Sequence, residues 1–460
     1  MPINSLLYPA NSAVAGGFDV ANSVRLDNNA YLSRTFSETG AGAGGGTFKW
    51  TLSLWFKRSL IDGNEHVLMS RYVNANKYVT IKINGNNKIE YRVYNSANQC
   101  RMTTTAVFRD VAAWTHFVIA QDSTLSTAGD RVKFFINGSR VTVFDTQTNF
   151  NQNVGGDFNT AAPHHIGAYN GGDEFQGYFA QVCFVDNVQY DADKFGEFDE
   201  DSGIWTPIDV SDLSTGATSF LLVFKDSSAL GTDSSGDNNN FSVNNITAID
   251  QATDTCTNNF ATGNILSPYA NRTITDGSLT ITSTTTQWTN ICSTIGVSSG
   301  KWWIELKHTA GSYGGLGIVF PFPKTENNVI GDFSAPVVQQ IGYIAASGDK
   351  KINNSTSSYG STWVGTGDIV NMSLNLDDNE LKFYKNGTVQ NSGTAIAISS
   401  GYTYFVGTSN YNSSGSSFNF GNPAYAISSG NADGKGYGNF EYAPPSGFLA
   451  LCTKNLAESG

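Results

Sequence analysis

Charged side chains are scarce in this 460-residue sequence: Asp, Glu, Lys and Arg together make up 14% of it, against about 25% in an average globular protein. Coiled coils draw heavily on Glu, Lys and Arg, so this class is not expected. Basic residues are fewer still, with 27 Lys and Arg against 39 Asp and Glu and a net charge of -12. Because such a surface repels phosphate groups, we expect no binding to nucleic acid or to anionic membranes.

Cysteine and long apolar runs are also in short supply. The five cysteines are widely spaced and form no Cys-x-x-Cys pair, so we predict isolated structural thiols and neither a disulfide framework nor a zinc site. No run approaches the ~18 apolar residues of a membrane-spanning helix. The first residues, MPINSLLYPA, lack the basic and apolar regions of a signal peptide. We therefore expect synthesis in a reducing cytoplasm and no membrane insertion.

Period-two alternation of bulky and small residues runs through most of the chain and predicts strands. It is clearest in residues 50–56, 78–83, 301–306 and 368–376. The many glycines, 48 in all, suit tight turns between such strands. No long helix is indicated, although residues 191–198 could form one short turn.

Three Asn-Gly dipeptides, the strongest short signal for a hairpin, follow predicted strands at Asn84-Gly85, Asn137-Gly138 and Asn386-Gly387. The segments VKFFINGSRV (132–141) and LKFYKNGTVQ (381–390) share one design, an aromatic strand, an Asn-Gly turn and a polar return. Each lies in its own half of the chain. We therefore predict an all-β protein made of two antiparallel β-sandwiches of the jelly-roll type in tandem.

The predicted boundaries divide the chain into five parts. An N-terminal arm (1–16) precedes the first jelly roll (17–254), and a linker (255–275) leads to the second sandwich (276–425). A C-terminal segment (426–460), anchored by Phe440, Tyr442 and Phe448, is expected to pack on the second domain. Residues 226–245 are polar and rich in turn formers; we expect them to wrap on the first domain.

The first half resembles laminin-G-like, concanavalin-A-type jelly rolls. The resemblance covers about residues 17–250 and lies in the order WTHFVIAQDST, RVKFFINGSRV and HHIGAYNGGDEFQGYFAQVCFVDNVQY. Phe175, Gly177, Asn137 and Gly138 match the family pattern of an Asn-Gly turn followed by Phe-x-Gly and a long strand. The resemblance implies the fold and is weak for function.

The second half resembles SPRY domains over about residues 275–425. SGKWWIELKH is similar to the entry strand of that family, GDIVNMSLNLDDNELKFYKNG to its central pair of strands and SSFNFGN to its closing strand. The Asn- and Ser-rich insert at residues 320–361 departs from the family pattern.

The whole chain, with TNNFATGN between the halves and APPSGFLALCTKNL near the end, resembles virion appendage proteins of marine bacteriophages. This resemblance implies a virion location, other virion proteins as partners and a homo-oligomer, with a trimer favoured. It implies a fibre that recognises host-surface glycans, or else a capsid decoration or head fibre that contacts only virion proteins. A glycan-cleaving enzyme on a concanavalin-like fold is the weaker alternative.

Catalytic signatures are weak, and we predict that the protein is not an enzyme. Glycosidases need two carboxylates at a fixed separation, and the nearest motif, around Glu197 and Asp199, lacks the last Glu and lies in a predicted loop. His116 falls within an apolar strand, where a core role is expected. His164 and His165 are adjacent on a strand and point to opposite faces, so they cannot easily share a metal.

Two sets of residues are candidate sites. Asp226, Asp233 and Asp237 could hold a structural calcium ion, although DSSG is also an ordinary turn sequence; no other cofactor is expected. For glycan or host binding, the candidates are Tyr343, Tyr359, Trp363, Asn410, Tyr411 and Asn412, because amides pair with sugar hydroxyls while aromatic faces cover sugar rings. Core packing is the alternative for each aromatic residue.

Overall fold

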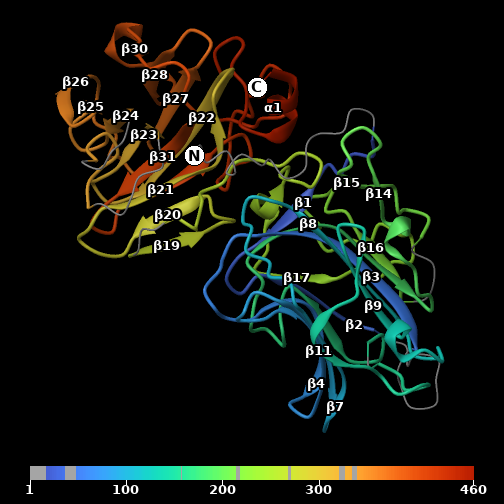
Figure 1. Ribbon diagram of the computed structural model, residues 1–460. Coiled ribbons are helices and arrows are strands. Elements are labelled where there is room, and N and C mark those ends of the chain that lie inside the picture. Colours follow the sequence, from blue (N-terminus) through green and yellow to red (C-terminus); the bar gives the residue numbers. More distant parts are fainter. Residues whose placement is uncertain are drawn as a thin grey trace. The chain divides into compact units, whose positions relative to one another are not determined.

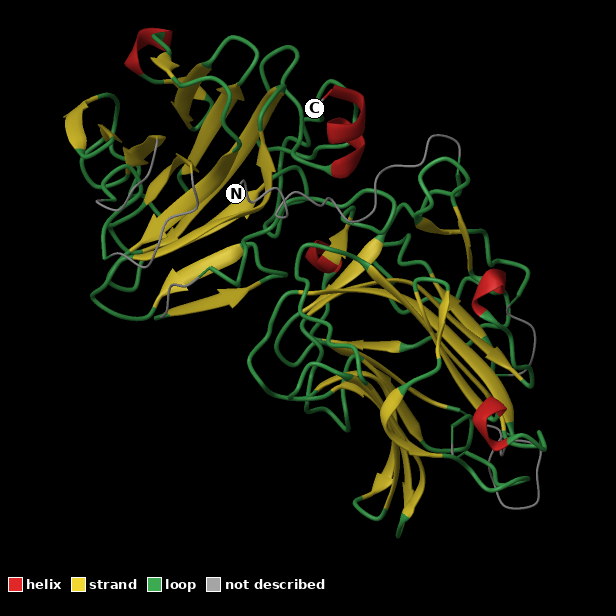
Figure 2. Ribbon diagram, viewed as in Figure 1, coloured by secondary structure: helices red, strands yellow, loops and turns green. Residues whose placement is uncertain are grey.

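The computed structural model describes residues 17–36, 48–156, 158–213, 218–267, 271–320, 327–333 and 339–459. These residues form two compact units, 17–257 and 258–459. Strands dominate each unit, as the yellow arrows of Figure 2 show. In this part of the chain no helix is long and apolar enough to cross a bilayer. The fold is thus nearly all-β, as predicted; the predicted N-terminal arm (1–16) lies outside the described residues.

The first unit is a sandwich of two antiparallel sheets whose inner faces share one apolar core (Figure 1). In order across the first sheet lie β10 (Ser139–Val141), β9 (Val132–Ile136), β8 (Thr115–Asp122), β3 (Lys49–Arg58), β13 (Gly177–Asp186), β1 (Ser23–Leu26) and β18 (Gln251–Ala252), with β16 (Phe220–Leu222) beside β13. Across the second lie β11 (Phe144–Thr148), β7 (Asn98–Thr104), β6 (Ile89–Asn95), β5 (Lys77–Ile83), β4 (His66–Asn74), β12 (Pro163–Ile166), β2 (Tyr31–Thr35) and β17 (Ser242–Asn244).

Short elements complete the first unit. β14 (Gly196–Phe198) and β15 (Trp205–Pro207) form a separate hairpin, and three 3-10 turns are η1 (Ala128–Asp130), η2 (Ala192–Lys194) and η3 (Ala248–Asp250). Residues 226–245 pack on this unit: Leu230 and Phe241 enter its core, and β17 pairs with β2.

The second unit is also a sandwich of two antiparallel sheets around one core. One sheet contains, in order, β19 (Arg272–Thr275), β20 (Thr280–Ser283), β32 (Gly415–Asn419), β22 (Lys301–Ala310), β27 (Ile369–Asn375), β28 (Glu380–Lys385) and β29 (Thr388–Val389), with β30 (Ile396–Ala397) beside β28. The other contains β21 (Thr289–Val297), β31 (Tyr404–Asn410), β23 (Gly315–Phe320), β24 (Gln339–Ile344), β25 (Asp349–Ile352) and β26 (Ser355–Ser358). η4 (Asn391–Gly393) and α1 (Thr453–Ser459) complete this unit.

The segment expected to be a linker (255–275) does not behave as one. Thr257 Oγ1 accepts a hydrogen bond from the Val20 amide of the first unit at 3.1 Å. Two residues later, the Asn259 amide donates to Thr453 Oγ1 of the second unit at 3.0 Å. Cys256 and Phe260 are buried on either side of the division. Burial of these apolar side chains explains why each end of the segment is fixed to its own unit.

Two of the three predicted Asn-Gly hairpins form the same structure. Asn137 and Gly138 have φ of 44° and 77°, and Asn386 and Gly387 have 48° and 75°, so each pair makes a two-residue turn at positive φ. In each hairpin the Asn side-chain oxygen also accepts a backbone amide of the strand that precedes the hairpin, His116 of β8 in one and Ile369 of β27 in the other, at 2.8 Å. This agreement in detail supports the related design of the two units.

The third Asn-Gly dipeptide forms a different turn. β5 and β6 are a hairpin, as predicted, but the residue with positive φ between them is Asn87, at 62°, rather than Gly85. The side-chain oxygen of Asn84 accepts the amides of Asn86 and Lys88 at 3.0 and 3.2 Å, which stabilises a longer connection. The longer connection pairs Tyr78 with Tyr94, whereas a two-residue turn would pair Tyr78 with Tyr91.

Gly138→Val and Gly387→Val are each expected to destabilise only their own unit. A Cβ on Gly138 would lie 2.3 Å from the Trp205 ring, and one on Gly387 would lie 2.5 Å from the Tyr442 ring. A β-branched residue at positive φ adds strain of about 1–3 kcal/mol. Hydrogen exchange on the full chain, read peptide by peptide, would localise each loss. Gly367→Val is the control for the ring contacts, because Gly367 also has a positive φ, 95°, but no atom lies within 4 Å of its Cβ. Equal loosening of both units by Gly138→Val or by Gly387→Val would contradict the prediction.

The C-terminal segment packs on the second unit through a buried carboxylate. Glu305, on β22, is fully buried and accepts the backbone amides of Glu441 and Tyr442 at 3.0 and 2.9 Å. Asn371 and Asn419 donate to its two oxygens at 3.1 and 3.0 Å. Of the three expected aromatic anchors, Phe440 is fully buried, and Tyr442 and Phe448 are partly buried in the same cluster.

All five cysteines are buried and unbonded, as predicted. Burial raises the pKa of Cys183 and of Cys452 to about 12. Thiols of this kind are unreactive, because the nucleophile is the thiolate.

Candidate functional site

Three of the predicted glycan-binding residues are core residues instead. Tyr343 lies on β24, where strand alternation turns it inward, and its hydroxyl donates to the Ser361 carbonyl. Tyr359 and Trp363 belong to the same apolar core, with 6% and 0% exposure. Burial raises the pKa of both tyrosines. A sugar cannot stack on rings that are covered, so the assignment of these three residues to a binding surface is wrong.

The other three predicted residues lie around the β31–β32 turn. Asn410 is fully buried, and its side chain donates to Ser416 Oγ at 2.9 Å and to the Ile281 carbonyl at 3.2 Å, so its role is structural. Tyr411 is half-buried and Asn412 is exposed. Tyr411 and Asn412 therefore lie at the surface and remain candidates for ligand binding.

Tyr411 belongs to a surface cluster of three aromatic rings, which we call the aromatic trio: Trp288, Tyr313 and Tyr411. The ring centroids of Trp288 and Tyr411 are 5.2 Å apart, and those of Tyr313 and Tyr411 are 5.1 Å apart. Tyr313 stands nearly perpendicular to both partners, at 81° and 86°. It is the most exposed of the three, at 38%. The ring face of Tyr313 is therefore directed differently from the ring faces of Trp288 and Tyr411, and the three rings form a corner.

Adjacent strands of one sheet hold the aromatic trio in place. Trp288 precedes β21, Tyr411 follows β31 and Tyr313 precedes β23, and these three strands are neighbours (Figure 1). The Trp288 amide donates to Asn327 Oδ1 at 2.7 Å, and the Tyr313 amide donates to Ser414 Oγ at 3.0 Å. The backbone beneath the rings is therefore fixed before any ligand arrives.

The tight turn after Tyr411 adds to this rigidity. The Ser414 amide donates to the Tyr411 carbonyl at 3.1 Å, and Asn412 and Ser413 both have positive φ, 51° and 60°. Serine is uncommon at such a φ and costs energy there. The turn presents the exposed Asn412 and Ser413 side chains beside the rings.

No charged side chain occurs in four described segments that supply the aromatic trio or hold its backbone. These segments are residues 284–288 (TTTQW), 311–313 (GSY), 327–328 (NN) and 410–414 (NYNSS). Hydroxyl and amide groups can donate to and accept from sugar hydroxyls, while ring faces cover apolar C–H surfaces. The chemistry therefore suits an uncharged polyhydroxylated ligand.

The carboxylates predicted to hold calcium serve turns in the structure. Asp233 Oδ1 accepts the amides of Leu221 and Ser235, and its Oδ2 accepts the Asn239 amide, all at 2.9 Å. Asp226 caps a short turn through Ser228, and Asp237 is exposed. Across the described ranges no three His, Cys, Asp or Glu residues gather as a metal site. The structure does not bring the three aspartates together.

A Ser-His pair in the first unit lacks the protonation pattern of a nucleophile and base. His116 Nε2 lies 2.8 Å from Ser53 Oγ, and the Trp205 indole N–H donates to His116 Nδ1 at 2.9 Å. Because an indole nitrogen can only donate, Nδ1 must accept and Nε2 carries the hydrogen. Burial lowers the pKa of His116 to about 3. The imidazole thus donates to Ser53 and cannot take its proton.

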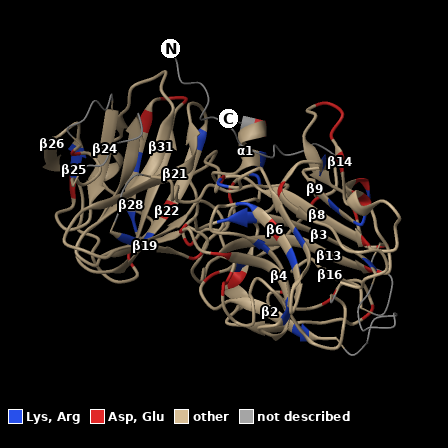
Figure 3. Ribbon diagram, turned by 60° about the horizontal axis from the view of Figure 1, so that its bottom comes forward, with Lys and Arg blue, Asp and Glu red and all other residues tan. Residues whose placement is uncertain are grey.

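The acidic motif around Glu197 and Asp199 sits on the exposed β14–β15 hairpin. The Asp199 carboxylate accepts the Ser202 amide at 2.7 Å and so stabilises the turn between the strands. Figure 3 shows this acidic tip in red next to β14. Glu197 is exposed on the same hairpin. Neither carboxyl group lies in a pocket that the structure describes.

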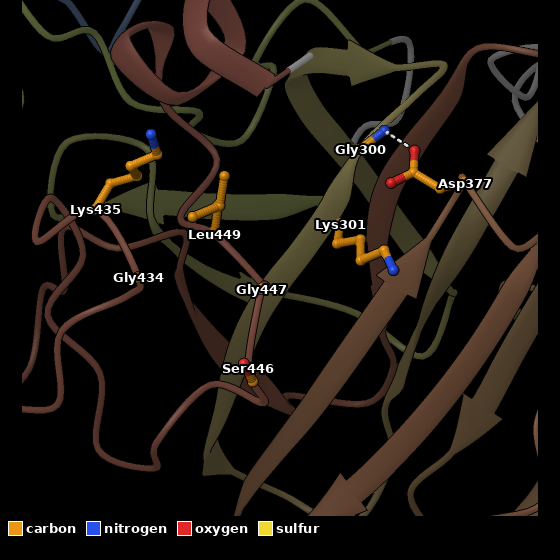
Figure 4. Close-up of a pocket in the computed structure, with 8 residues that line it drawn as sticks. All are labelled: Gly300, Lys301, Asp377, Gly434, Lys435, Ser446, Gly447 and Leu449. Carbon is orange, nitrogen blue, oxygen red and sulfur yellow. Dashed lines mark hydrogen bonds between the residues drawn. The ribbon is translucent and has the colours of Figure 1, made fainter.

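A shallow hollow of about 510 Å³ lies elsewhere on the second unit (Figure 4). Its polar wall includes Asp377, which accepts the Gly300 amide at 2.8 Å, and the charged groups Lys301 and Lys435. Each lysine is already paired with a carboxylate, Asp378 and Glu458 respectively. With Leu449 as the only large apolar side chain lining it, the hollow offers less to a ligand than the aromatic trio.

Neither Trp288 nor Tyr313 was among the binding residues predicted from the sequence. The available signal was a single tryptophan within the polar run TTTQWT, which has no apolar neighbour with which to form a core strand. Its proximity to Tyr411 depends on the pairing of β21 with β31, which are more than a hundred residues apart.

Comparison with known proteins gives a family for part of the first unit. Residues 33–191 match the model described as the concanavalin A-like lectin/glucanases superfamily. No curated protein matches the chain. Similar solved structures include the SPRY domain of human HERC1 (14% identity, 32% of this chain and 92% of that chain, TM-score 0.27), a human SPRY domain (12%, 35% and 98%, 0.25) and stonustoxin (14%, 35% and 27%, 0.27). At such TM-scores the likeness carries no argument about function. Residues 33–191 of the first unit are therefore similar to concanavalin A-like domains of the laminin-G kind.

Proposed function

We propose that the protein is a non-catalytic glycan-binding protein and that the aromatic trio of its second unit holds the sugar. The observation that carries this proposal is the corner of three aromatic rings 5.1–6.4 Å apart, beside the exposed amide and hydroxyl groups of Asn412 and Ser413. Tyr313 is 38% exposed and Trp288 and Tyr411 are half-buried, so part of each residue remains at the surface. The match of the first unit to a superfamily of lectins and glucanases supports carbohydrate as the class of ligand, without favouring binding over cleavage.

The biological setting we propose is the bacteriophage virion, where the protein would recognise host-surface glycans as a fibre or appendage. This setting rests on the sequence resemblance alone. Single stacking and hydrogen-bonding contacts are weak, so we further propose a symmetric homo-oligomer, with a trimer favoured, that presents several trios at once and gains avidity. A decoration protein that touches only other virion proteins is the competing role.

Tyr411→Ala is expected to weaken binding to neutral oligosaccharides by about fivefold to tenfold, because an aromatic contact contributes about 0.5–1.5 kcal/mol beyond its buried area. An array of neutral oligosaccharides, probed with the full chain, provides the ligand. Titration of the best-bound sugar then compares the wild type with the variant.

Tyr402→Ala is the matched control, since Tyr402 is a half-buried aromatic residue of the same unit that pairs with Phe320 and lies outside the aromatic trio. Its sugar affinity should equal that of the wild type. Unchanged affinity in Tyr411→Ala, or failure of the wild type to bind any neutral sugar on the array, would count against the proposed function. Virions that carry Tyr411→Ala and adsorb normally to cells would favour the decoration role.

A further inference from the structure

Four tyrosines gather on the outer face of the second sheet of the first unit. The strand register places Tyr72 opposite Tyr78, and Tyr78 opposite Tyr94. The rings of Tyr78 and Tyr94 stack at 5.2 Å and 23°. Tyr169, from the turn after β12, lies 5.3 Å from Tyr72 and 5.5 Å from Tyr78, centroid to centroid. All four side chains are half-buried, which leaves part of each at the surface.

Two backbone hydrogen bonds close the turn that carries Tyr169. The Tyr169 amide donates to the Gly172 carbonyl at 2.6 Å, and the Gly172 amide donates back to the Tyr169 carbonyl at 2.9 Å. Asn170 and Gly171 have the positive φ that such a two-residue turn requires. Burial, with a smaller effect of Tyr78 and Tyr72, raises the pKa of Tyr169 to about 12. The phenol therefore stays neutral at physiological pH and can donate a hydrogen bond.

The hydroxyl groups of these four half-buried tyrosines differ from those of buried tyrosines in the first unit. None of them makes a hydrogen bond with another of the residues that the structure describes, in contrast to the buried Tyr91, whose hydroxyl donates to Gln121. Four phenols on one face thus offer donors and acceptors that the fold does not use.

An arginine lies against this face. The guanidinium carbon of Arg92 is 4.9 Å from the centroid of the Tyr94 ring and 5.6 Å from that of Tyr78. Its Nε donates to Asn98 Oδ1 at 2.8 Å, which fixes the plane of the guanidinium. No carboxylate of the described residues pairs with it.

Comparison with the opposite residue on strand β7 makes the missing carboxylate partner of Arg92 informative. Arg92 stands directly opposite Arg101 in the register of β6 and β7. Arg101 is neutralised by Glu90, at 2.9 Å. Like charges directly opposite each other are unfavourable, and Arg92 has no such counter-ion. Figure 3 shows basic residues in blue on β4 and β6, although the chain as a whole is acidic.

We propose that Arg92 and the four tyrosines form a second carbohydrate site, specific for a short oligosaccharide that carries a carboxylate. The planar fork of arginine pairs with a carboxylate through two parallel hydrogen bonds. The tyrosine rings cover the apolar face of the sugar, and their hydroxyls reach its hydroxyl groups. A short ligand is favoured because the net charge of -12 works against a long polyanion.

Tetragalacturonate and its methyl ester test the proposal, since esterification removes the negative charges and adds only methyl groups. Calorimetric titration of the full chain should show binding of tetragalacturonate and much weaker binding of the ester. Arg92→Gln should lower the affinity for tetragalacturonate about tenfold or more, and Arg92→Lys should restore only part of it, because lysine lacks the fork. Arg140→Gln is the control, since Arg140 lies on the other sheet of this unit and pairs with Asp130.

The test of the acidic site can be distinguished from the test of the aromatic trio, because Tyr411→Ala should leave the affinity for tetragalacturonate unchanged. Equal binding of the acid and the ester, no effect of Arg92→Gln, or no binding of tetragalacturonate would each overturn the acidic site. If Tyr411→Ala abolished the binding of tetragalacturonate and Arg92→Gln did not, the acidic ligand would bind at the aromatic trio. That result would also overturn the acidic site at Arg92. Unchanged hydrogen exchange in the Arg92 variants confirms that the unit stays folded.

Discussion

Replacing Asp254 with alanine is expected to lower the free energy of unfolding of the first unit by about 3–5 kcal/mol. Asp254 Oδ2 lies 2.8 Å from Lys57 Nζ, and the two side chains are 0% and 1% exposed. The Trp114 indole N–H donates to Asp254 Oδ1 at 3.0 Å. Without the carboxylate, the buried ammonium group loses this 2.8 Å ion pair and the indole N–H loses this acceptor.

The double variant Lys57→Met/Asp254→Leu should recover most of this loss, because it removes both charges and keeps apolar volume. Asp191→Ala is the surface control: Asp191 pairs with Lys133 but is 54% exposed, so its removal should cost little. Hydrogen exchange of peptides in β3 and β8 measures the stability of this unit within the full chain. A loss below 1 kcal/mol in Asp254→Ala would show that water reaches Lys57.

Glu305→Ala should destabilise the second unit by about 3 kcal/mol or more, because several buried N–H donors lose one shared acceptor. Two of these donors are the Glu441 and Tyr442 amides, so the expected first effect is release of the C-terminal segment. Hydrogen exchange and limited proteolysis within residues 424–442 report on that release. Glu380→Ala is the control, since Glu380 lies on β28 of the same sheet and is partly exposed.

The pH dependence offers an independent check on Glu305. Burial raises the pKa of Glu305 from 4.5 to about 7, even though the N–H donors oppose the shift. The folded state then binds more protons than the unfolded state between about pH 4.5 and 7, so the contribution of this group to stability falls as pH rises through that interval. In Glu305→Gln this slope should vanish. Parallel pH profiles of the wild type and Glu305→Gln would contradict the shift.

The fold could be predicted from the sequence to the extent that its signals are local. The turns at Asn137-Gly138 and Asn386-Gly387 depend on two residues and their flanking strands, and both form as expected. The turn at Asn84-Gly85 depends on competition between a tight turn and the capping bonds of Asn84, which the dipeptide alone does not reveal. Helix α1 had no periodic pattern long enough to indicate it.

The site was harder to predict because its residues meet only through long-range strand pairing. Tyr411 and Asn412 were found because a polar turn beside an aromatic residue is visible in the sequence. Tyr343 belongs to the Asn- and Ser-rich insert but lies in the apolar run IGYIAA, and the phase of β24 turns its ring inward. Phase depends on which face of the strand meets the core, and only the tertiary structure decides this.

The buried, high-pKa cysteines make the molecule suitable for chemical labelling without removal of any native residue. None of the five thiols reaches the surface, so a cysteine introduced at the exposed Asn412 would be the one site open to a maleimide dye. A fluorophore placed there would lie next to Tyr411 and report occupancy of the aromatic trio by quenching. A second label at the exposed Asn95, close in sequence to Tyr94, would give the tyrosine face its own signal in a separate preparation.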